Sequence, residues 1–164
     1  MDMRYLPTGN EMISIPRLNE ITAGIEDITF LHMGYKSLVD LRGGADMALI
    51  EPFVEQDGTP IPFADLEWDR LHFWVPHFSG QAGHIQVDGT ILAPIGERGF
   101  LYRMELTNMD STTHSIVCGL QGCWNSAWHC VNEDKQIEGT MHCFESSWNG
   151  SLIFDMRCGV PLFC

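Results

Sequence analysis

Short runs in which apolar and polar residues alternate constrain the fold of this chain most strongly. The clearest run is FLYRMELT at residues 100–107, and a second lies at residues 152–158. An alternation with a period of two is typical of a strand that buries one face. Dipeptides that favour turns accompany the runs: Gly43-Gly44, Asp57-Gly58, Ser79-Gly80, Asp88-Gly89 and Asn149-Gly150. The pattern predicts an all-β protein, an antiparallel two-sheet sandwich.

Further strands are predicted from shorter apolar runs at residues 46–54, 70–76, 84–93, 114–120, 126–132 and 139–145. The N-terminal part is ambiguous, because its apolar residues recur at helical spacing: Leu18, Ile21, Ile25 and Ile28. A short helix over roughly 18–29 and an extended lead-in strand fit these residues about equally well. We expect a single β-sandwich domain over residues 1–164, with 1–43 as its lead-in.

Composition excludes some classes of function. Hydrophobic residues make up 45% of the 164 and charged residues 19%, as expected for a globular domain with a core. The 22 acidic and 9 basic residues give a net charge of −13, which disfavours binding to nucleic acid or to anionic lipid. The chain shows no secretory signal and no apolar run as long as a membrane span. We therefore expect a cytoplasmic protein with reduced thiols.

Residues 123–150 concentrate three Cys, three Trp and two His. The gaps between the six cysteines do not match the close pairs that structural zinc requires, so we expect no metal and no cofactor. Cys118 alternates in phase with Ile116 and Leu120, which predicts a small buried apolar side chain. Disulfides remain the alternative if the protein resides in an oxidising compartment.

The five tryptophans fit either of two roles. They can fill the core, or they can stack on the C–H faces of a sugar while polar neighbours bind its hydroxyls. The candidate saccharide site consists of Trp124, Asn125, Trp128, His129, Glu133 and Trp148. Pairs of carboxylates such as Glu133 with Asp134 arise by chance in so acidic a chain, and a solvated surface accounts for them.

Four segments resemble one kind of module: GADMALIEPFVEQDGTPI, LHFWVPHF, GTILAPIGERGFLYRMELTN and HCVNEDKQIEGTMHCFESSWNGSLIFDMRCGVPLF. Together they are similar to the N-terminal β-supersandwich domain that precedes the (α/α)6 catalytic barrel of bacterial glycogen-debranching-like glycoside hydrolases and phosphorylases. The likeness spans roughly residues 44–164. It implies a galactose-mutarotase-like fold that packs on a catalytic barrel of the same parent chain, and it transfers no catalytic residue.

Three functions follow as hypotheses. The first is a non-catalytic domain of a carbohydrate-active enzyme that helps to shape the site of a missing (α/α)6 domain, with homo-oligomers as a further association. The second is a free-standing module that binds an oligo- or polysaccharide. The third is an aldose-epimerase-like enzyme, in which His129 and Glu133 would act as acid and base.

Overall fold

A computed structural model describes residues 6–32, 37–44, 47–122, 124–130, 134–138, 142–143, 153–155 and 162–163. At residues 31–32 and 37–38, and from residue 124 onward, it describes the backbone alone. All regular elements in these ranges are β-strands, and every pair of neighbouring strands is antiparallel. The prediction of an all-β, antiparallel fold is confirmed. No helix that could cross a membrane occurs in the described ranges.

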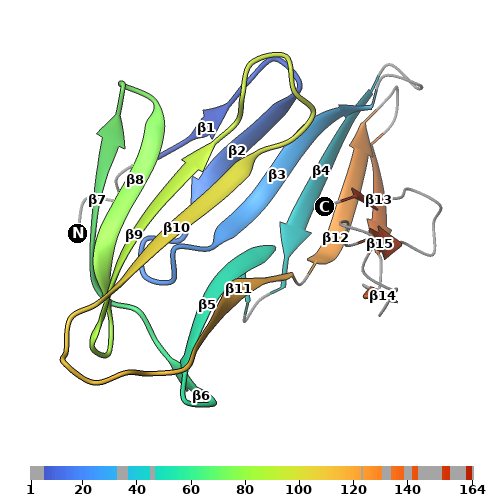
Figure 1. Cartoon of the computed structure of the whole chain (residues 1–164). Helices are drawn as coiled ribbons and strands as arrows, with labels where there is room; N and C mark the ends of the chain where they lie inside the picture. Colours follow the sequence, from blue (N-terminus) through green and yellow to red (C-terminus); the bar gives the residue numbers. More distant parts are fainter. Residues whose placement is uncertain are drawn as a thin grey trace.

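The larger sheet has nine strands. Six of them follow one another as β1 (Thr8–Gly9), β2 (Ile13–Leu18), β3 (Ile25–His32), β4 (Ser37–Gly43), β12 (Trp124–Cys130) and β13 (Asp134–Glu138). The other three form a branch that joins β3 at one residue pair: β5 (Ile50–Gln56), β6 (Thr59–Ile61) and β11 (Ile116–Gly122). In Figure 1 this branch extends below the rest of the sheet.

The second sheet has four strands in the order β10-β9-β8-β7. They are β7 (Ala64–Leu71), β8 (Val75–Ala82), β9 (Ile85–Leu92) and β10 (Leu101–Asn108). This sheet faces β1–β4 of the larger one (Figure 1). Three short strands form a separate small sheet: β14 (His142–Cys143), β15 (Ile153–Asp155) and β16 (Leu162–Phe163).

The core lies between the two large sheets. The nine-stranded sheet contributes buried residues such as Ile15, Ile25 and Leu41, and the four-stranded sheet contributes Phe78 and Val87. On β7–β10 the side chains alternate between this core and solvent, as the run at residues 100–107 predicted. We call the solvent side of β7–β10 the outer face.

Of the two alternatives for residues 18–29, the helix is wrong, and extended strands end at Leu18 and begin again at Ile25. Residues 19–24 form a turn between β2 and β3, and the side-chain oxygen of Asn19 accepts hydrogen bonds from the backbone N–H groups of Ile21 and Thr22 at 2.9 and 3.1 Å. Ala23 then adopts a left-handed φ of 58°, which ends any helical path. An Asn that binds its own following backbone favours a turn over a helix.

Two other predictions from local sequence are also wrong. Residues 70–76 are not one strand, because they contain the turn between β7 and β8. Ser79-Gly80 and Asp88-Gly89 are not turns but lie inside β8 and β9. Gly89 is needed there because a Cβ atom at this position would overlap the ring of Phe78. By contrast, Asp57-Gly58 does form the turn between β5 and β6, with φ of 52° and 80°.

Cys118 is exposed on β11, so its predicted burial is wrong. It is the only free cysteine within the part of the chain whose side chains are described. The physical reason is the position of β11, which pairs with β5 in the branch of the nine-stranded sheet, where Val117 and Leu120 are exposed as well. The five other cysteines lie outside the described side chains.

Candidate functional site

The predicted saccharide site lies mainly on β12, whose backbone register is described. Trp128 is paired with Asp40 of β4, and His129 is paired with Val39. Val39 is a core residue, and neighbouring positions of a strand alternate between the two faces of its sheet. Positions 128 and 129 therefore belong to opposite faces, and the sheet does not bring them to one surface.

The structure describes only some of the other residues of the predicted saccharide site. Trp124 is paired with Gly43, and Asn125 falls where the register of β12 against β4 shifts. Glu133 and Trp148 lie outside the described residues, so the pairing of His129 with Glu133 as acid and base stays a prediction.

Two tryptophans with described side chains have different environments. Trp68 is 5% exposed; its ring centroid lies 5.0 Å from that of Phe78, and its Nε1 donates a hydrogen bond to the Glu20 carbonyl at 3.0 Å. Trp74 is 58% exposed in the turn between β7 and β8. Both roles expected of tryptophan, core and surface, therefore occur in this chain.

The turn that carries Trp74 is unusual in its backbone. His72 and Phe73 have φ of 49° and 73°, in the left-handed region that residues other than glycine rarely adopt. Phe73 is 88% exposed, and Arg70 Nη1 donates a hydrogen bond to its carbonyl at 3.4 Å. A strained turn with exposed aromatic rings is a candidate recognition element, because strain of this kind persists mainly where function needs it.

The outer face adjoins this turn and consists of rows of residues that run across the strands. The row nearest the turn is apolar, with Leu71 paired to Val75 and Leu92 paired to Leu101. The next two rows are polar; they consist of Asp69, His77, Thr90 and Arg103, then Glu67, Ser79, Asp88 and Glu105. An apolar strip beside two rows of hydrogen-bonding groups provides both kinds of contact that a small polar ligand needs.

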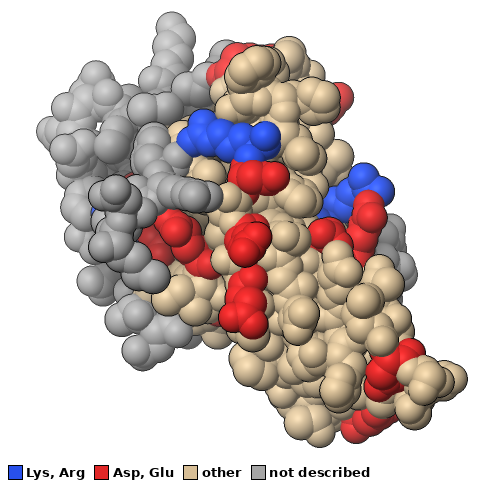
Figure 2. Space-filling view, turned by 90° about the vertical axis from the view of Figure 1, so that its left-hand side faces the viewer, with Lys and Arg blue, Asp and Glu red and all other residues tan. Residues whose placement is uncertain are grey.

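Neighbouring side chains hold the carboxylates of the outer face. His77 Nδ1 lies 2.7 Å from Asp69 Oδ1, Gln86 donates a hydrogen bond to Asp88 at 3.0 Å, and Arg103 forms an ion pair with Glu105. Figure 2 shows this side of the molecule, where Asp and Glu side chains follow one another in a column and Lys and Arg side chains are few.

A hollow of about 460 Å³ adjoins β7, the edge strand of the outer face. Glu67, Asp69 and Ser79 of the polar rows contribute to its wall, and Trp68 and Glu20 complete it from the side of the core. The hydrogen bond from Trp68 to Glu20 fixes the relative position of β7 and the turn between β2 and β3. The hollow thus extends the outer face around its edge.

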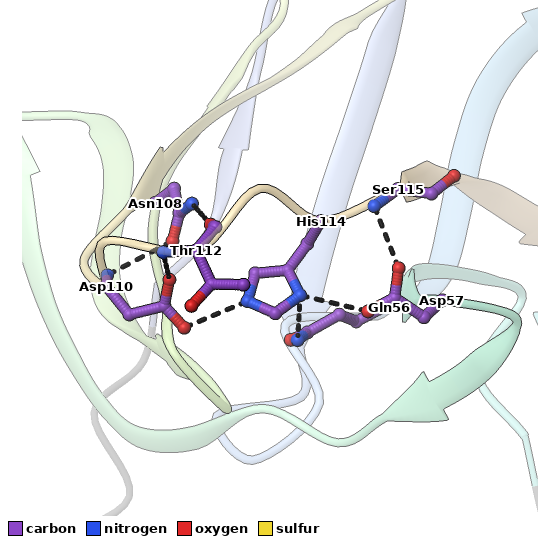
Figure 3. Close-up of polar contacts among 7 residues, drawn as sticks. All are labelled: Gln56, Asp57, Asn108, Asp110, Thr112, His114 and Ser115. Carbon is purple, nitrogen blue, oxygen red and sulfur yellow. Dashed lines mark hydrogen bonds and ion pairs between the residues drawn. The ribbon is translucent and has the colours of Figure 1, made fainter.

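A second polar cluster surrounds His114 (Figure 3). Its Nδ1 lies 2.9 Å from Asp57 Oδ2, and its Nε2 lies 2.9 Å from Asp110 Oδ2. A carboxylate can only accept, so these two contacts favour the imidazolium, in which both ring nitrogens donate. Gln56 Nε2 also lies 2.9 Å from Nδ1. The backbone N–H of Ser115 also donates to Asp57 Oδ1 at 2.9 Å. The cluster fastens the turn between β5 and β6 to the connection between β10 and β11.

The three groups of this cluster shift one another's pKa. Hydrogen bonds to Asp110 and Asp57 raise the pKa of His114. The pKa of Asp57 is lowered, chiefly by the hydrogen bond from the Ser115 backbone, and that of Asp110 is lowered, chiefly by the one from His114. Both ring nitrogens of His114 lie within hydrogen-bond distance of protein groups, so neither is open to a metal or a substrate. We interpret the cluster as a structural clasp.

Sequence reasoning missed both features for identifiable reasons. The segment around Phe73 and Trp74 is apolar, which predicts a strand, although the charged pair Asp69-Arg70 before it and Pro76 after it are compatible with a turn. His114 lies 57 residues from Asp57, so no local pattern could have paired them.

Among the residues with described side chains, no group of His, Cys, Asp or Glu is arranged to hold a metal ion. Comparisons of the chain with protein-family models, with curated proteins and with solved structures found no match.

Proposed function

We propose that this chain is a non-catalytic β-sandwich module of a carbohydrate-active protein, and that it binds a saccharide on the outer face of β7–β10. The observation that carries the proposal is the exposed Trp74, held in a strained turn beside the apolar and polar rows of that face. An exposed indole offers a flat apolar surface for the C–H face of a sugar ring. Asp69, His77 and Thr90 offer acceptors and donors for its hydroxyls.

The charge of the face indicates the kind of saccharide. Four carboxylates lie in the two polar rows, and Arg103 is the only Arg or Lys in them. A uronic acid or a sulfated sugar would be repelled by this surface, so the proposed ligand is a neutral saccharide. The face is open to solvent, whereas glycoside hydrolysis depends on a carboxyl whose pKa a buried environment raises. The outer face is therefore better suited to binding a saccharide than to hydrolysing one.

Calorimetric titration with a set of neutral oligosaccharides tests the proposal. We expect Trp74→Ala to weaken binding by about 10-fold or more, since truncated aromatic anchors typically cost 2 kcal/mol or more. Leu120→Ala, which removes an exposed apolar side chain from β11, is the matched control and leaves the affinity unchanged.

Two results would contradict the proposal. The first is a wild-type chain that binds none of the neutral saccharides. The second is an affinity that Trp74→Ala leaves intact, which would transfer the site to another surface, such as the face of β12 that carries position 128.

A second candidate function is packing against a catalytic domain, in the manner of the supersandwich domain that the sequence resembles. The exposed Cys118 and Leu120 favour it, because they lie on one face of β11 and form a small apolar surface on the branch of the larger sheet. Alkylation of the Cys118 thiol would then be fast in this chain alone and slow in a longer protein that includes an (α/α)6 domain. Equal rates in the two proteins would rule out this surface as the contact.

A further inference from the structure

Strand β10 forms one edge of the four-stranded sheet, and neither a bulge nor a proline blocks that edge. It pairs with β9 without a bulge over eight residues, from Leu101 to Asn108. In the part of the chain that the structure describes, β9 is the only strand that pairs with it. The strand contains no Lys and no Pro, the residues that commonly block the edges of sheets.

The opposite edge of the same sheet is protected. Strand β7 shifts register between Ala64 and Glu67, and Asp65 within this bulge has a left-handed φ of 54°. A bulge of this kind bends the edge away from a straight partner strand. The sheet is thus open to a further strand at β10 and closed at β7.

A second copy of β10 can satisfy the open edge only in certain registers. In an antiparallel pair, residues that direct their N–H and C=O groups to the partner alternate along each strand. In a pair of identical strands, two residues can therefore stand opposite each other only when their residue numbers are both odd or both even. Near the middle of β10 this leaves three registers, centred on Arg103, Met104 or Glu105.

Charge selects one of the three. A pair centred on Arg103 puts two arginines opposite each other, and a pair centred on Glu105 puts two glutamates opposite each other; like charges in these positions are destabilising. A pair centred on Met104 instead places Arg103 of each copy opposite Glu105 of the other, on the outer face. On the core side it places Tyr102 opposite Leu106.

We propose that two copies of this chain associate edge to edge, through antiparallel pairing of their β10 strands with Met104 opposite Met104. The two four-stranded sheets then form one continuous sheet of eight strands, joined by about six to eight backbone hydrogen bonds. The contact is isologous, so it closes with two copies and does not propagate into a filament.

Arg103 and Glu105, which select the register, are accessible to a second copy of the chain. The side chains of Arg103 and Glu105 are 73% and 57% exposed, and they form an ion pair with each other along the strand. In the dimer each can exchange this partner for the equivalent group of the other copy without moving the backbone. The turn with Trp74 lies outside the paired strands, so the association does not depend on saccharide binding.

Sedimentation velocity across a range of protein concentrations tests the proposal, with a reducing agent to keep the six cysteines from cross-linking. We expect a reversible monomer–dimer equilibrium for the wild type. Arg103→Glu and Glu105→Arg each place like charges opposite each other at two positions, and each should weaken association about 10-fold or more. Both side chains are exposed, so the circular dichroism spectrum should not change.

Mixing the two variants gives the decisive result. A copy with Glu at 103 and Glu at 105 meets a copy with Arg at both positions, so every opposite pair attracts and the mixture should form dimers. The double variant Arg103→Glu/Glu105→Arg should likewise recover self-association. The control Glu67→Arg makes the same charge change at the protected edge of β7 and should dimerise like the wild type.

The proposal is overturned if the wild type sediments as a monomer at every concentration. It is equally overturned if the single variants associate as the wild type does, or if their mixture stays monomeric. A wild-type chain that dimerises but binds no saccharide would refute the proposed function alone, because Trp74 and the residues named for the sugar hydroxyls, Asp69, His77 and Thr90, do not lie on β10.

Discussion

Replacing Phe73 by glycine should separate the stability of the sandwich from its proposed binding. Phe73 has a φ of 73° in the turn between β7 and β8, a backbone conformation that brings a Cβ atom toward the following carbonyl oxygen. Glycine has no Cβ and adopts this conformation without strain. We therefore expect Phe73→Gly to make the protein more stable while it removes a ring that is offered to the ligand.

The magnitude follows from three contributions. Relief of the left-handed strain contributes about 1–2 kcal/mol. The greater freedom of glycine in the unfolded chain offsets about 0.5–1 kcal/mol of that gain. The ring is 88% exposed, so the apolar burial lost is only about a tenth of the 1.5–3 kcal/mol typical of a buried side chain. The net gain is about 0.3–0.7 kcal/mol, or about 1–3 °C in Tm for a chain of this length.

Urea denaturation and calorimetric Tm measure this gain, and the saccharide titration measures the loss of binding. Phe73→Ala is the matched control, because it removes the ring but keeps the Cβ atom and therefore the strain. Its stability should lie about 0.2–0.3 kcal/mol below that of the wild type, because it loses the small burial of the ring and gains nothing from strain, and it should show the same loss of affinity as Phe73→Gly. Equal stabilities of the alanine and glycine variants, or a destabilised glycine variant, would refute the argument from strain.

Two further predictions concern the core and the clasp around His114. Gly89→Ala should lower the free energy of unfolding by about 1–3 kcal/mol, because the new methyl group overlaps the Phe78 ring; Gly99→Ala, which meets open space, should have little effect. The raised pKa of His114 stabilises the fold below about pH 6.5 and ceases to do so as the pH rises through the folded value. The lowered pKa of its two carboxylates stabilises the fold above about pH 4 and ceases to do so as the pH falls through the folded values. In urea denaturation at several pH values, His114→Gln should therefore lose most stability between about pH 4 and 6.5, and a loss that does not vary with pH would contradict the assigned charges.

The alternating residues of β10 could be predicted from the sequence, because the period of two is a property of neighbouring residues in an extended chain. The same local reasoning could not decide between helix and strand at residues 18–29, where an apolar spacing of three and four coincided with a turn that Asn19 stabilises. The apolar residues there have helical spacing because some lie at the end of β2 and others at the start of β3, and no helix connects them.

By itself the sequence determined the class of the fold, its antiparallel strands and its acidic surface, since each depends on composition or on residues close in the chain. Only the tertiary structure decided that Trp68 is core and Trp74 is surface, because burial depends on which distant strand covers a residue. It likewise placed Gly89 beneath Phe78 and brought His114 between two carboxylates, since strand pairing and loop contacts join residues that no local pattern connects.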